Sequence, residues 1–263
     1  MKDLIILKIG GSVITDKFSK EPKIDEKNLE RISKEIASVY DKKKMSLILV
    51  HGAGSYGHVI VKETGIDKGI VREEQLKAFA ETQRLQNELN VLVTKQLIKD
   101  GIPAFPCQAS SFAVMDSKRL VRMDTSAIKG LLDIGMVPVL YGVPAYDKEQ
   151  KSSILSGDQI APYLGVEFNA KKIIHGTNVD GIFTSDPNKD PNAELIPEIS
   201  SENIDKVKEW LAGSTATDVT GGMFGKIMEI LNSGVEAQVV NALVPGNIVK
   251  AIRGEKIGTI IRF

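Results

Sequence analysis

Short apolar runs rich in β-branched residues alternate along this chain with stretches whose apolar residues recur at helical spacing. Residues 4–7 and 46–50 form the first two runs, and between them Leu29, Ile32 and Ile36 repeat every three or four positions. This order predicts a strand, a helix and a second strand, the unit from which sheets covered by helices on both faces are built. We therefore expect an α/β fold.

The remaining expected elements follow the same alternation. A long helix is expected over residues 73–99, with Leu76 and Leu89 on its apolar side, and a shorter helix is expected to start at Asp124-Thr125 and to end near Gly135. Strands are expected at residues 136–140, 172–175, 238–240 and 259–261, and a hairpin-like segment at 141–154 is the best internal boundary. One domain with two halves is therefore expected.

Composition narrows the class of function. The 263 residues suffice for one large domain, and 34 basic side chains balance 34 acidic ones, which argues against binding a nucleic acid. The single cysteine, Cys107, cannot form an intramolecular disulfide, as expected in a reducing compartment. No stretch approaches the roughly 18 apolar residues of a membrane span, and no signal peptide is visible. A cytoplasmic protein that binds neither nucleic acid nor membranes is expected.

The first of three glycine-rich turns follows the first predicted strand. Lys8 lies at the end of this strand, and Gly10, Gly11 and Ser12 come directly after it. Backbone without side chains can bring N–H groups against phosphate oxygens, although a Gly-Gly turn alone is more often only a turn. Lys8 strengthens the functional interpretation, because a lysine in an apolar strand is costly to bury without an anionic partner.

The second turn contains a Gly-x-Gly-x-x-Gly pattern from Gly52 to Gly57, followed by His58. A dinucleotide-binding unit needs another strand within about 30 residues. Nothing strand-like occurs here before Ile102, so phosphate binding by the glycine backbone is favoured over NAD or FAD binding. His58 taken alone is either a core histidine or a donor to an anionic substrate.

The third turn, residues 218–225, leads into a predicted helix whose first turn carries Lys226. A cation at that position opposes the helix dipole, and a bound anion would explain it. The turn is not a Walker A loop, because Thr220 stands where the first glycine is required and Ile227 follows the lysine.

Together these segments contain the groups that phosphoryl transfer requires. Lys8, Lys17 and Lys226 are cations, the turns offer N–H groups, and Asp158 is suited either to orient lysines or to bind Mg²⁺. Asp158 and Asp180 are also common residues of helix caps and turns, so each is a weak signal alone. The three histidines lack the spacing of zinc ligands, which disfavours a zinc hydrolase.

The motifs resemble, in order, those of the amino-acid kinase superfamily: Lys-x-Gly-Gly-Ser, His-Gly-x-Gly, Ser-Gly-Asp, Val-Asp-Gly and Asp-Val-Thr-Gly-Gly-Met-x-x-Lys. The resemblance covers residues 4–262. The Gly-Ala-Gly-Ser-Tyr-Gly-His segment that ends in His58, together with Lys17, is similar to isopentenyl phosphate kinases, which are typical of archaea. Asn178 and the pair Val143-Pro144 depart from the family pattern at the nucleotide and central pockets.

This resemblance implies a three-layer αβα sandwich with a mainly parallel open central sheet. It also implies an acceptor-binding half over about residues 1–155, an ATP-binding half over about residues 156–263, and a homodimer. The implied reaction uses ATP and Mg²⁺ to convert isopentenyl phosphate into isopentenyl diphosphate, in an alternative mevalonate route to isoprenoids.

The resemblance further implies roles residue by residue, without metal-ligating side chains. The implied catalytic residues are Lys8, Lys17, His58, Asp158 and Lys226. The implied ATP site contains Lys8, Gly10, Gly11, Ser12, Gly54, Asp180, Gly222 and Lys226. The implied contacts of the acceptor phosphate are Ala53, Gly54, His58 and Gly157.

Other functions stay open at this stage. A kinase for another small acceptor, such as dimethylallyl phosphate or fosfomycin, has the same sequence features. A nucleotide sensor without turnover is disfavoured because it has no need for all of these charged residues, and an NAD-dependent oxidoreductase rests only on the glycine pattern. Candidate walls of an apolar tail pocket are Tyr56, Phe79, Gln83 and Phe112, and a plain core role is equally open for them.

Overall fold

The central sheet starts from the two strands that the sequence predicts first. The structure of this chain, a computed structural model, describes residues 2–16, 19, 21–187, 189–212 and 222–263. Strand β1 (Asp3–Ile9) pairs in parallel with β2 (Met45–His51) on one side and with β9 (Lys172–Thr177) on the other. Because β9 follows the predicted internal boundary, one sheet runs through both halves of the chain.

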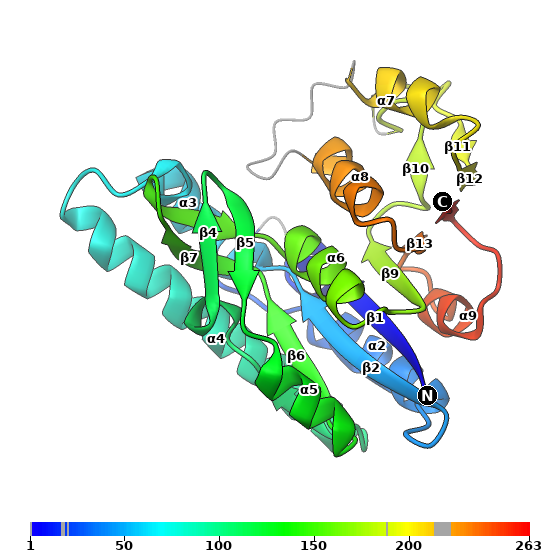
Figure 1. Ribbon diagram of the computed structural model, residues 1–263, viewed down its shortest axis with the longest axis horizontal. Coiled ribbons are helices and arrows are strands. Elements are labelled where there is room, and N and C mark those ends of the chain that lie inside the picture. Colours follow the sequence, from blue (N-terminus) through cyan, green and yellow to red (C-terminus); the bar gives the residue numbers. More distant parts are fainter. Residues whose placement is uncertain (1, 17–18, 20, 188, 213–221) are drawn as a thin grey trace.

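Eight strands form this sheet in the order β12-β14-β13-β9-β1-β2-β6-β3. Figure 1 labels its middle strands β13, β9, β1, β2 and β6. Every neighbouring pair is parallel except β13 with β14. The strands not yet given are β3 (Ala104–Pro106), β6 (Val137–Tyr141), β12 (Glu198–Ile199), β13 (Ala237–Asn241) and β14 (Thr259–Ile261). The strands expected at residues 136–140, 172–175, 238–240 and 259–261 are thereby confirmed.

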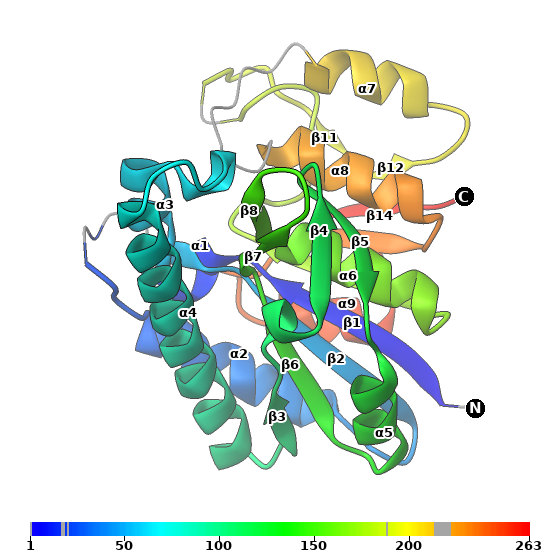
Figure 2. The same ribbon diagram turned by 60° about the vertical axis from the view of Figure 1, so that its left-hand side comes forward.

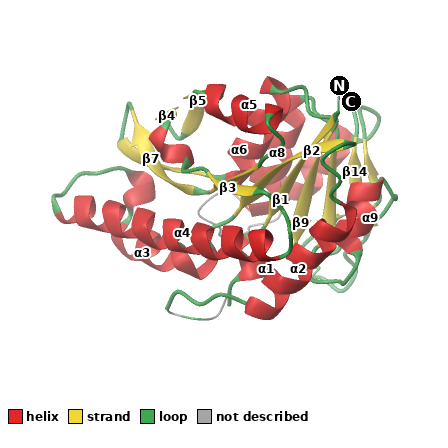
Figure 3. Ribbon diagram, turned by 90° about the horizontal axis from the view of Figure 1, so that it is seen from below, coloured by secondary structure: helices red, strands yellow, loops and turns green. Residues whose placement is uncertain are grey.

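Helices cover both faces of the sheet, which confirms the three-layer αβα sandwich (Figure 3). One face packs against α5 (Ser126–Asp133), α6 (Gly157–Glu167), α7 (Ile204–Ala212) and α8 (Gly222–Ser233). The other packs against α1 (Gly11–Ile14), α2 (Glu26–Val39), α4 (Glu74–Lys99) and α9 (Asn247–Arg253). Side chains of β1 alternate between the two cores, with Ile6 facing α6 and Leu7 facing α2.

A smaller four-stranded sheet lies between α4 and α6 (Figure 2). Its order is β5-β4-β7-β8, and its bounds are β4 (Ala113–Asp116), β5 (Arg119–Met123), β7 (Val143–Asp147) and β8 (Lys151–Leu155). The hairpin of β7 and β8 confirms the hairpin expected at residues 141–154. The shorter elements are η1 (Gly54–Tyr56), α3 (His58–Thr64), η2 (Ile66–Lys68), η3 (Ala109–Ser111), β10 (Ile182–Phe183) and β11 (Leu195–Ile196).

Helix α4 differs from its expected amphipathic pattern. Leu76 is 55% exposed, so its expected place on the buried side is wrong, whereas Leu89 is buried as expected. Polar side chains occupy much of the buried face, and several of them are hydrogen-bonded: Gln75 donates to the Thr64 carbonyl, and Asn90 contacts the His51 ring. Buried polar groups are tolerated when they are hydrogen-bonded, and this pairing moves the buried face away from Leu76.

No helix among the described residues is long and apolar enough to cross a membrane.

Candidate active site

Two glycine turns meet in backbone contact where β1 and β2 end. The Gly10 N–H donates to the Gly176 carbonyl at 2.8 Å, and the Gly52 N–H donates to the Ile9 carbonyl at 2.9 Å. A Cβ atom on Gly11 would lie 2.2 Å from the Gly54 nitrogen, and one on Gly52 would lie 2.5 Å from the Gly11 nitrogen. Side chains cannot be accommodated there, so the turns approach each other only because both are glycine.

The second turn needs glycine for a further reason. Gly54 has a φ of 52°, in the left-handed region, and a Cβ atom there would lie 1.9 Å from Thr15 Oγ1. Thr15 joins the turns, since its hydroxyl donates to the Gly11 carbonyl at 2.8 Å and accepts from the Ser55 N–H at 3.1 Å. The result is a small-residue cradle at the carboxyl edge of a parallel sheet, where such folds bind ligands.

Three charged side chains lie beside this cradle, two buried lysines and one partly exposed aspartate. Asp158 Oδ1 lies 2.9 Å from Lys8 Nζ and 2.6 Å from Lys226 Nζ. Lys8 comes from β1, Lys226 from α8 and Asp158 from the first turn of α6, whose N-cap Ser156 accepts the Asp158 N–H at 3.1 Å. Two ammonium groups against one carboxylate leave one net positive charge, which suits an anionic ligand.

The environment shifts the pKa values of this cluster in opposite directions. Burial alone raises the pKa of Asp158, but Lys226 and Lys8 outweigh burial and hold that pKa well below its ordinary value. Burial lowers the pKa of Lys226 to about 8, and Asp158 opposes this shift without cancelling it. The carboxylate is therefore ionised at neutral pH, and Lys226 loses its proton more readily than an exposed lysine.

A cavity of about 260 Å³ opens onto the cluster between the small sheet and α8. Its lining residues are Asp67, Lys118, Arg119, Ile154, Ser156, Asp158, Gln159, Gly225 and Glu229. Arg119 from β5 and Glu229 from α8 form an ion pair across it, with Nη2 to Oε2 at 2.9 Å. The cluster is therefore reachable by a ligand although its lysines are buried.

The predicted acceptor residues lie around the same edge. Ala53 and Gly54 are in the second turn, and His58 is the first residue of α3 and is exposed. Gly157 starts α6, and a Cβ atom on it would lie 3.4 Å from Lys8 Cε. The two predicted acceptor segments therefore approach the buried charges from β2 and from α6.

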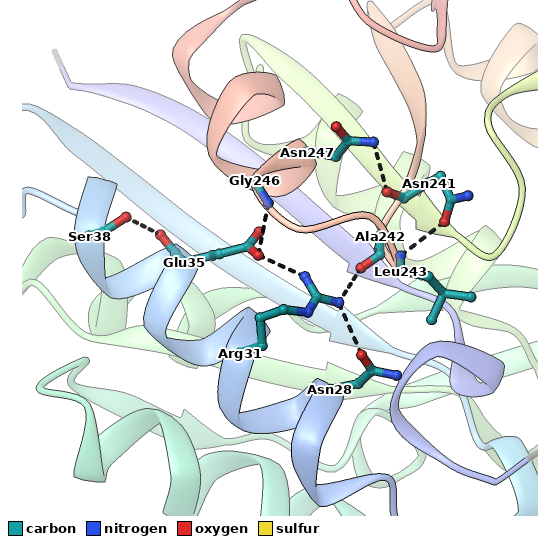
Figure 4. A network of polar contacts seen from close by, with 9 residues as sticks. All are labelled: Asn28, Arg31, Glu35, Ser38, Asn241, Ala242, Leu243, Gly246 and Asn247. Carbon is teal, nitrogen blue, oxygen red and sulfur yellow. Dashed lines mark hydrogen bonds and ion pairs between the residues drawn. The ribbon is translucent and has the colours of Figure 1, made fainter.

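The loop that carries Asp180 is held by the end of β13. Asn241 Nδ2 donates to Asp180 Oδ1 at 2.9 Å, and Asn241 Oδ1 accepts the Leu243 N–H at 3.0 Å. Asn247 Nδ2 donates to the Asn241 carbonyl at 3.0 Å (Figure 4). Asp180 is exposed, so its second carboxylate oxygen can bind a ligand while Asn241 orients the carboxylate through Oδ1.

Helix α2, in the other half of the chain, braces the loop between β13 and α9. Arg31 donates to the Ala242 carbonyl at 2.6 Å and pairs with Glu35 at 2.7 Å, and Glu35 Oε1 accepts the Gly246 N–H at 3.0 Å (Figure 4). Both ends of the β13–α9 loop are thereby fixed to α2. Arg31 thus helps to fix the position of Asn241, which in turn orients Asp180.

The structure brings most of the predicted residues together. Lys8, Gly157, Asp158 and Lys226 form one group, and Gly10, Gly11, Ser12, Ala53 and Gly54 form the adjoining cradle. Gly222 is the first residue of α8, Asp180 lies on the neighbouring loop, and Lys17 lies outside the described residues. The roles of these residues stay predictions.

Sequence reasoning missed three parts of the site. His175, Asn241 and the Arg119–Glu229 pair were not singled out, although His175 stands out as a polar residue in a buried apolar strand. Of the candidate pocket walls, Tyr56 is buried in the α2-side core, and Gln83 Nε2 donates to the Tyr141 hydroxyl at 3.4 Å. Within the described part of the chain, no three His, Cys, Asp or Glu side chains group as metal ligands.

The fold, the touching glycine turns and the paired lysines define a small-molecule kinase, and the chain belongs to the amino acid kinase family. A sequence profile of that family matches residues 3–241. The chain is therefore a phosphotransferase.

Particular relatives narrow the comparison. The chain is 44% identical to an isopentenyl phosphate kinase of Methanothermobacter thermautotrophicus, over 97% of each chain. It is 39% identical to an isopentenyl phosphate kinase of Methanocaldococcus jannaschii, over 99% of each. An X-ray structure of an isopentenyl phosphate kinase superposes with a TM-score of 0.84 at 39% identity, covering 98% of this chain and 99% of that one.

Replacement of Gly11 by alanine tests the contact between the turns. Because its Cβ would lie 2.2 Å from the Gly54 nitrogen, Gly11→Ala is expected to abolish most activity and to lower the free energy of unfolding by about 2 kcal/mol or more. Gly130→Ala in α5 is the matched control: no atom lies within 4 Å of the new methyl group, so stability is expected to rise by about 0.5–1 kcal/mol. Denaturant unfolding and initial rates measure both. Wild-type activity in Gly11→Ala would contradict the contact.

Replacement of Arg31 by methionine tests the brace on the β13–α9 loop, which follows Asn241, the hydrogen-bond partner of Asp180. Loss of the bonds to Ala242 and Glu35 is expected to raise the KM for ATP about fivefold and to leave the acceptor KM within about twofold. Lys34→Met is the control: Lys34 forms a surface ion pair with Glu30 on the same helix, so its loss should leave both constants unchanged. Equal increases in both KM values would argue against a specific effect on the nucleotide side.

Proposed function

We propose that this chain transfers the γ-phosphoryl group of ATP to the phosphate of isopentenyl phosphate, forming isopentenyl diphosphate and ADP. The observation that carries the proposal is the buried Lys8–Asp158–Lys226 cluster beside two touching glycine turns. The relatives at 44% and 39% identity, both isopentenyl phosphate kinases over nearly the full chain, support the choice of acceptor.

The proposed roles follow the geometry of the edge. The N–H groups of Gly10, Gly11 and Ser12 and the ammonium of Lys8 contact the transferring and β-phosphates. The second turn and the start of α6 hold the acceptor phosphate through Ala53, Gly54, His58 and Gly157. Asp180, Gly222 and Lys226 belong to the nucleotide site. Lys17 stabilises the transition state, and Asp158 holds the lysines at the phosphates.

The reaction needs charge compensation more than it needs a base. A phosphate monoester has a second pKa near 6, so at neutral pH it is mostly a dianion and a ready nucleophile. One of its oxygens bonds to the γ-phosphorus as the bond from that phosphorus to the β–γ bridging oxygen breaks, and ADP carries the charge away. Two anions must approach for this step, and Lys8, Lys226 and the glycine N–H groups offset their repulsion.

Magnesium enters this scheme with the nucleotide. Mg²⁺ is commonly held by substrate phosphates with one or two carboxylates. Oδ1 of Asp158 already contacts the ammonium groups of Lys8 and Lys226. The oxygen ligands left for the ion are therefore mainly phosphate oxygens. When bound, the ion neutralises phosphate charge.

We further propose that the enzyme works in the cytoplasm as a homodimer. Cys107 is a free, buried thiol, as is usual in a reducing compartment.

The outer face of α4 and the edge strand β3 expose Val91, Ile98 and Phe105 at 52%, 57% and 43%, an apolar surface that a second copy would cover. A monomeric mass by light scattering would contradict the dimer.

Acceptor profiling tests the proposed reaction. With ATP and Mg²⁺, isopentenyl phosphate is expected to give the highest kcat/KM in a panel of dimethylallyl phosphate, geranyl phosphate, fosfomycin, acetylglutamate and UMP. His58→Ala is expected to raise the acceptor KM about tenfold or more with a smaller effect on the KM for ATP, because a donor to the acceptor phosphate is lost. Preference for another acceptor would overturn the substrate, and an unchanged acceptor KM would remove His58 from the site.

The alkaline limb of the pH profile tests Lys226. Its pKa of about 8 means that the ammonium is charged below this pH and neutral above it, so kcat/KM for ATP is expected to fall as pH rises through 8. Lys226→Arg is expected to move this limb to higher pH, because a guanidinium stays protonated. Phosphate groups titrate near pH 6 and affect only the acidic limb. An unmoved limb in the arginine variant would contradict the role of Lys226.

A further inference from the structure

His175 is a completely buried polar residue with no evident packing reason to be histidine. It lies on β9, in register with Lys8 on β1 and with Val239 on β13. Ile173, two residues earlier on the same face, belongs to the apolar core under α6 and α8. An aliphatic side chain would also pack against this apolar core. The imidazole is therefore better explained by a polar contact that it makes.

Its two ring nitrogens have no hydrogen-bond partner among the described residues. Nδ1 nevertheless lies 3.5 Å from Asp158 Oδ1, about half an ångström longer than a formed N–H···O bond. The other buried histidine, His51, differs: Nδ1 contacts the Gly52 carbonyl at 3.1 Å, and Nε2 contacts Asn90 Nδ2 at 3.0 Å. The unused donor of His175 is therefore aimed at the charged cluster.

The ring is neutral under working conditions. Burial, together with nearby Lys226 and Lys8, lowers the pKa of His175 to about 4, although Asp158 acts in the opposite direction. A neutral imidazole carries one N–H, so it can donate to the carboxylate without adding a third positive charge.

The Asp158 carboxylate faces a change of partners during the reaction. In the structure both ammonium groups contact the same oxygen, Oδ1. Phosphate oxygens compete for those ammonium groups, and a buried carboxylate that loses its partners is strongly destabilised. Within the described part of the chain, His175 Nδ1 is the third nitrogen within ion-pair distance of that oxygen.

We propose that His175 is a positioning residue whose Nδ1–H closes onto Asp158 when bound phosphates draw Lys8 and Lys226 away from the carboxylate. The new hydrogen bond holds Asp158 in place and lets both lysines turn toward the ligand. This inference rests on the proposed function, because it requires the lysines to contact nucleotide phosphates.

Nitrogen NMR on the wild-type enzyme tests the proposal directly. The chain has three histidines, so a sample labelled with ¹⁵N-histidine gives few signals, which single substitutions assign. With Mg²⁺ and a non-hydrolysable ATP analogue, His175 is expected to be protonated at Nδ1, with its N–H proton shifted downfield on binding. His51, whose ring nitrogens already have partners, is the internal control and should change little.

Two substitutions separate positioning from packing. Asparagine places its amide nitrogen where Nδ1 of histidine lies, and leucine keeps a similar volume without a donor. His175→Leu is expected to lower kcat about tenfold with the acceptor KM within about twofold, since a hydrogen bond to a charged group is lost. His175→Asn is expected to recover most of this loss. Melting temperatures of both variants report stability separately.

The outcomes distinguish this inference from the function beneath it. If calorimetry shows no binding of the ATP analogue, the nucleotide site and the inference fall together. If the analogue binds but the His175 signals are unchanged, or the proton lies on Nε2, only the inference is overturned. Equal or higher kcat in His175→Leu than in His175→Asn would likewise assign the residue to packing alone.

Discussion

One carboxylate oxygen, Oδ1 of Asp158, holds two buried ammonium groups, and the rest of the site depends on it. Without this oxygen, Lys8 and Lys226 would be two unpaired like charges on buried side chains, which is strongly unfavourable. A buried ion pair often stabilises a fold no more than well-packed apolar residues would, because desolvation offsets most of the attraction. Its retention beside a backbone cradle is therefore best explained by the ligand that the spare positive charge attracts.

The parallel sheet explains why these groups meet at all. Adjacent parallel strands end at the same edge, so the turns after β1 and β2 lie next to each other, and the loops after β9 and β13 follow along that edge. Glycine then permits the backbone contact that side chains would prevent. The Arg31–Glu35 brace ties the β13 loop to α2, so the two halves of the chain share one rigid edge although each supplies different groups.

The sequence predicted the parts of the fold that have strong local signals. Short apolar runs, helical periodicity and helix-end residues located β1, β2, β6, β9, β13 and β14 and helices α2, α4 and α5 within a few residues. It missed β4 and β5; in the case of β5 the reason is that this strand exposes Arg119 and Arg122 and has no apolar run. It misjudged Leu76, because the buried face of α4 is decided by polar partners such as Thr64 and His51 that lie far along the chain or on other elements.

For the site, the sequence by itself determined which chemical groups are available: glycine turns after strands, lysines beside them and an aspartate at a helix start. Their local character made them visible, since each motif spans only a few residues. Only the tertiary structure decided that Lys226 reaches across 68 positions to Asp158, that His175 lies unpaired against the same oxygen, and that burial lowers the pKa of Lys226. Distances and burial arise from the packing of segments far apart in the chain, and no local pattern encodes them.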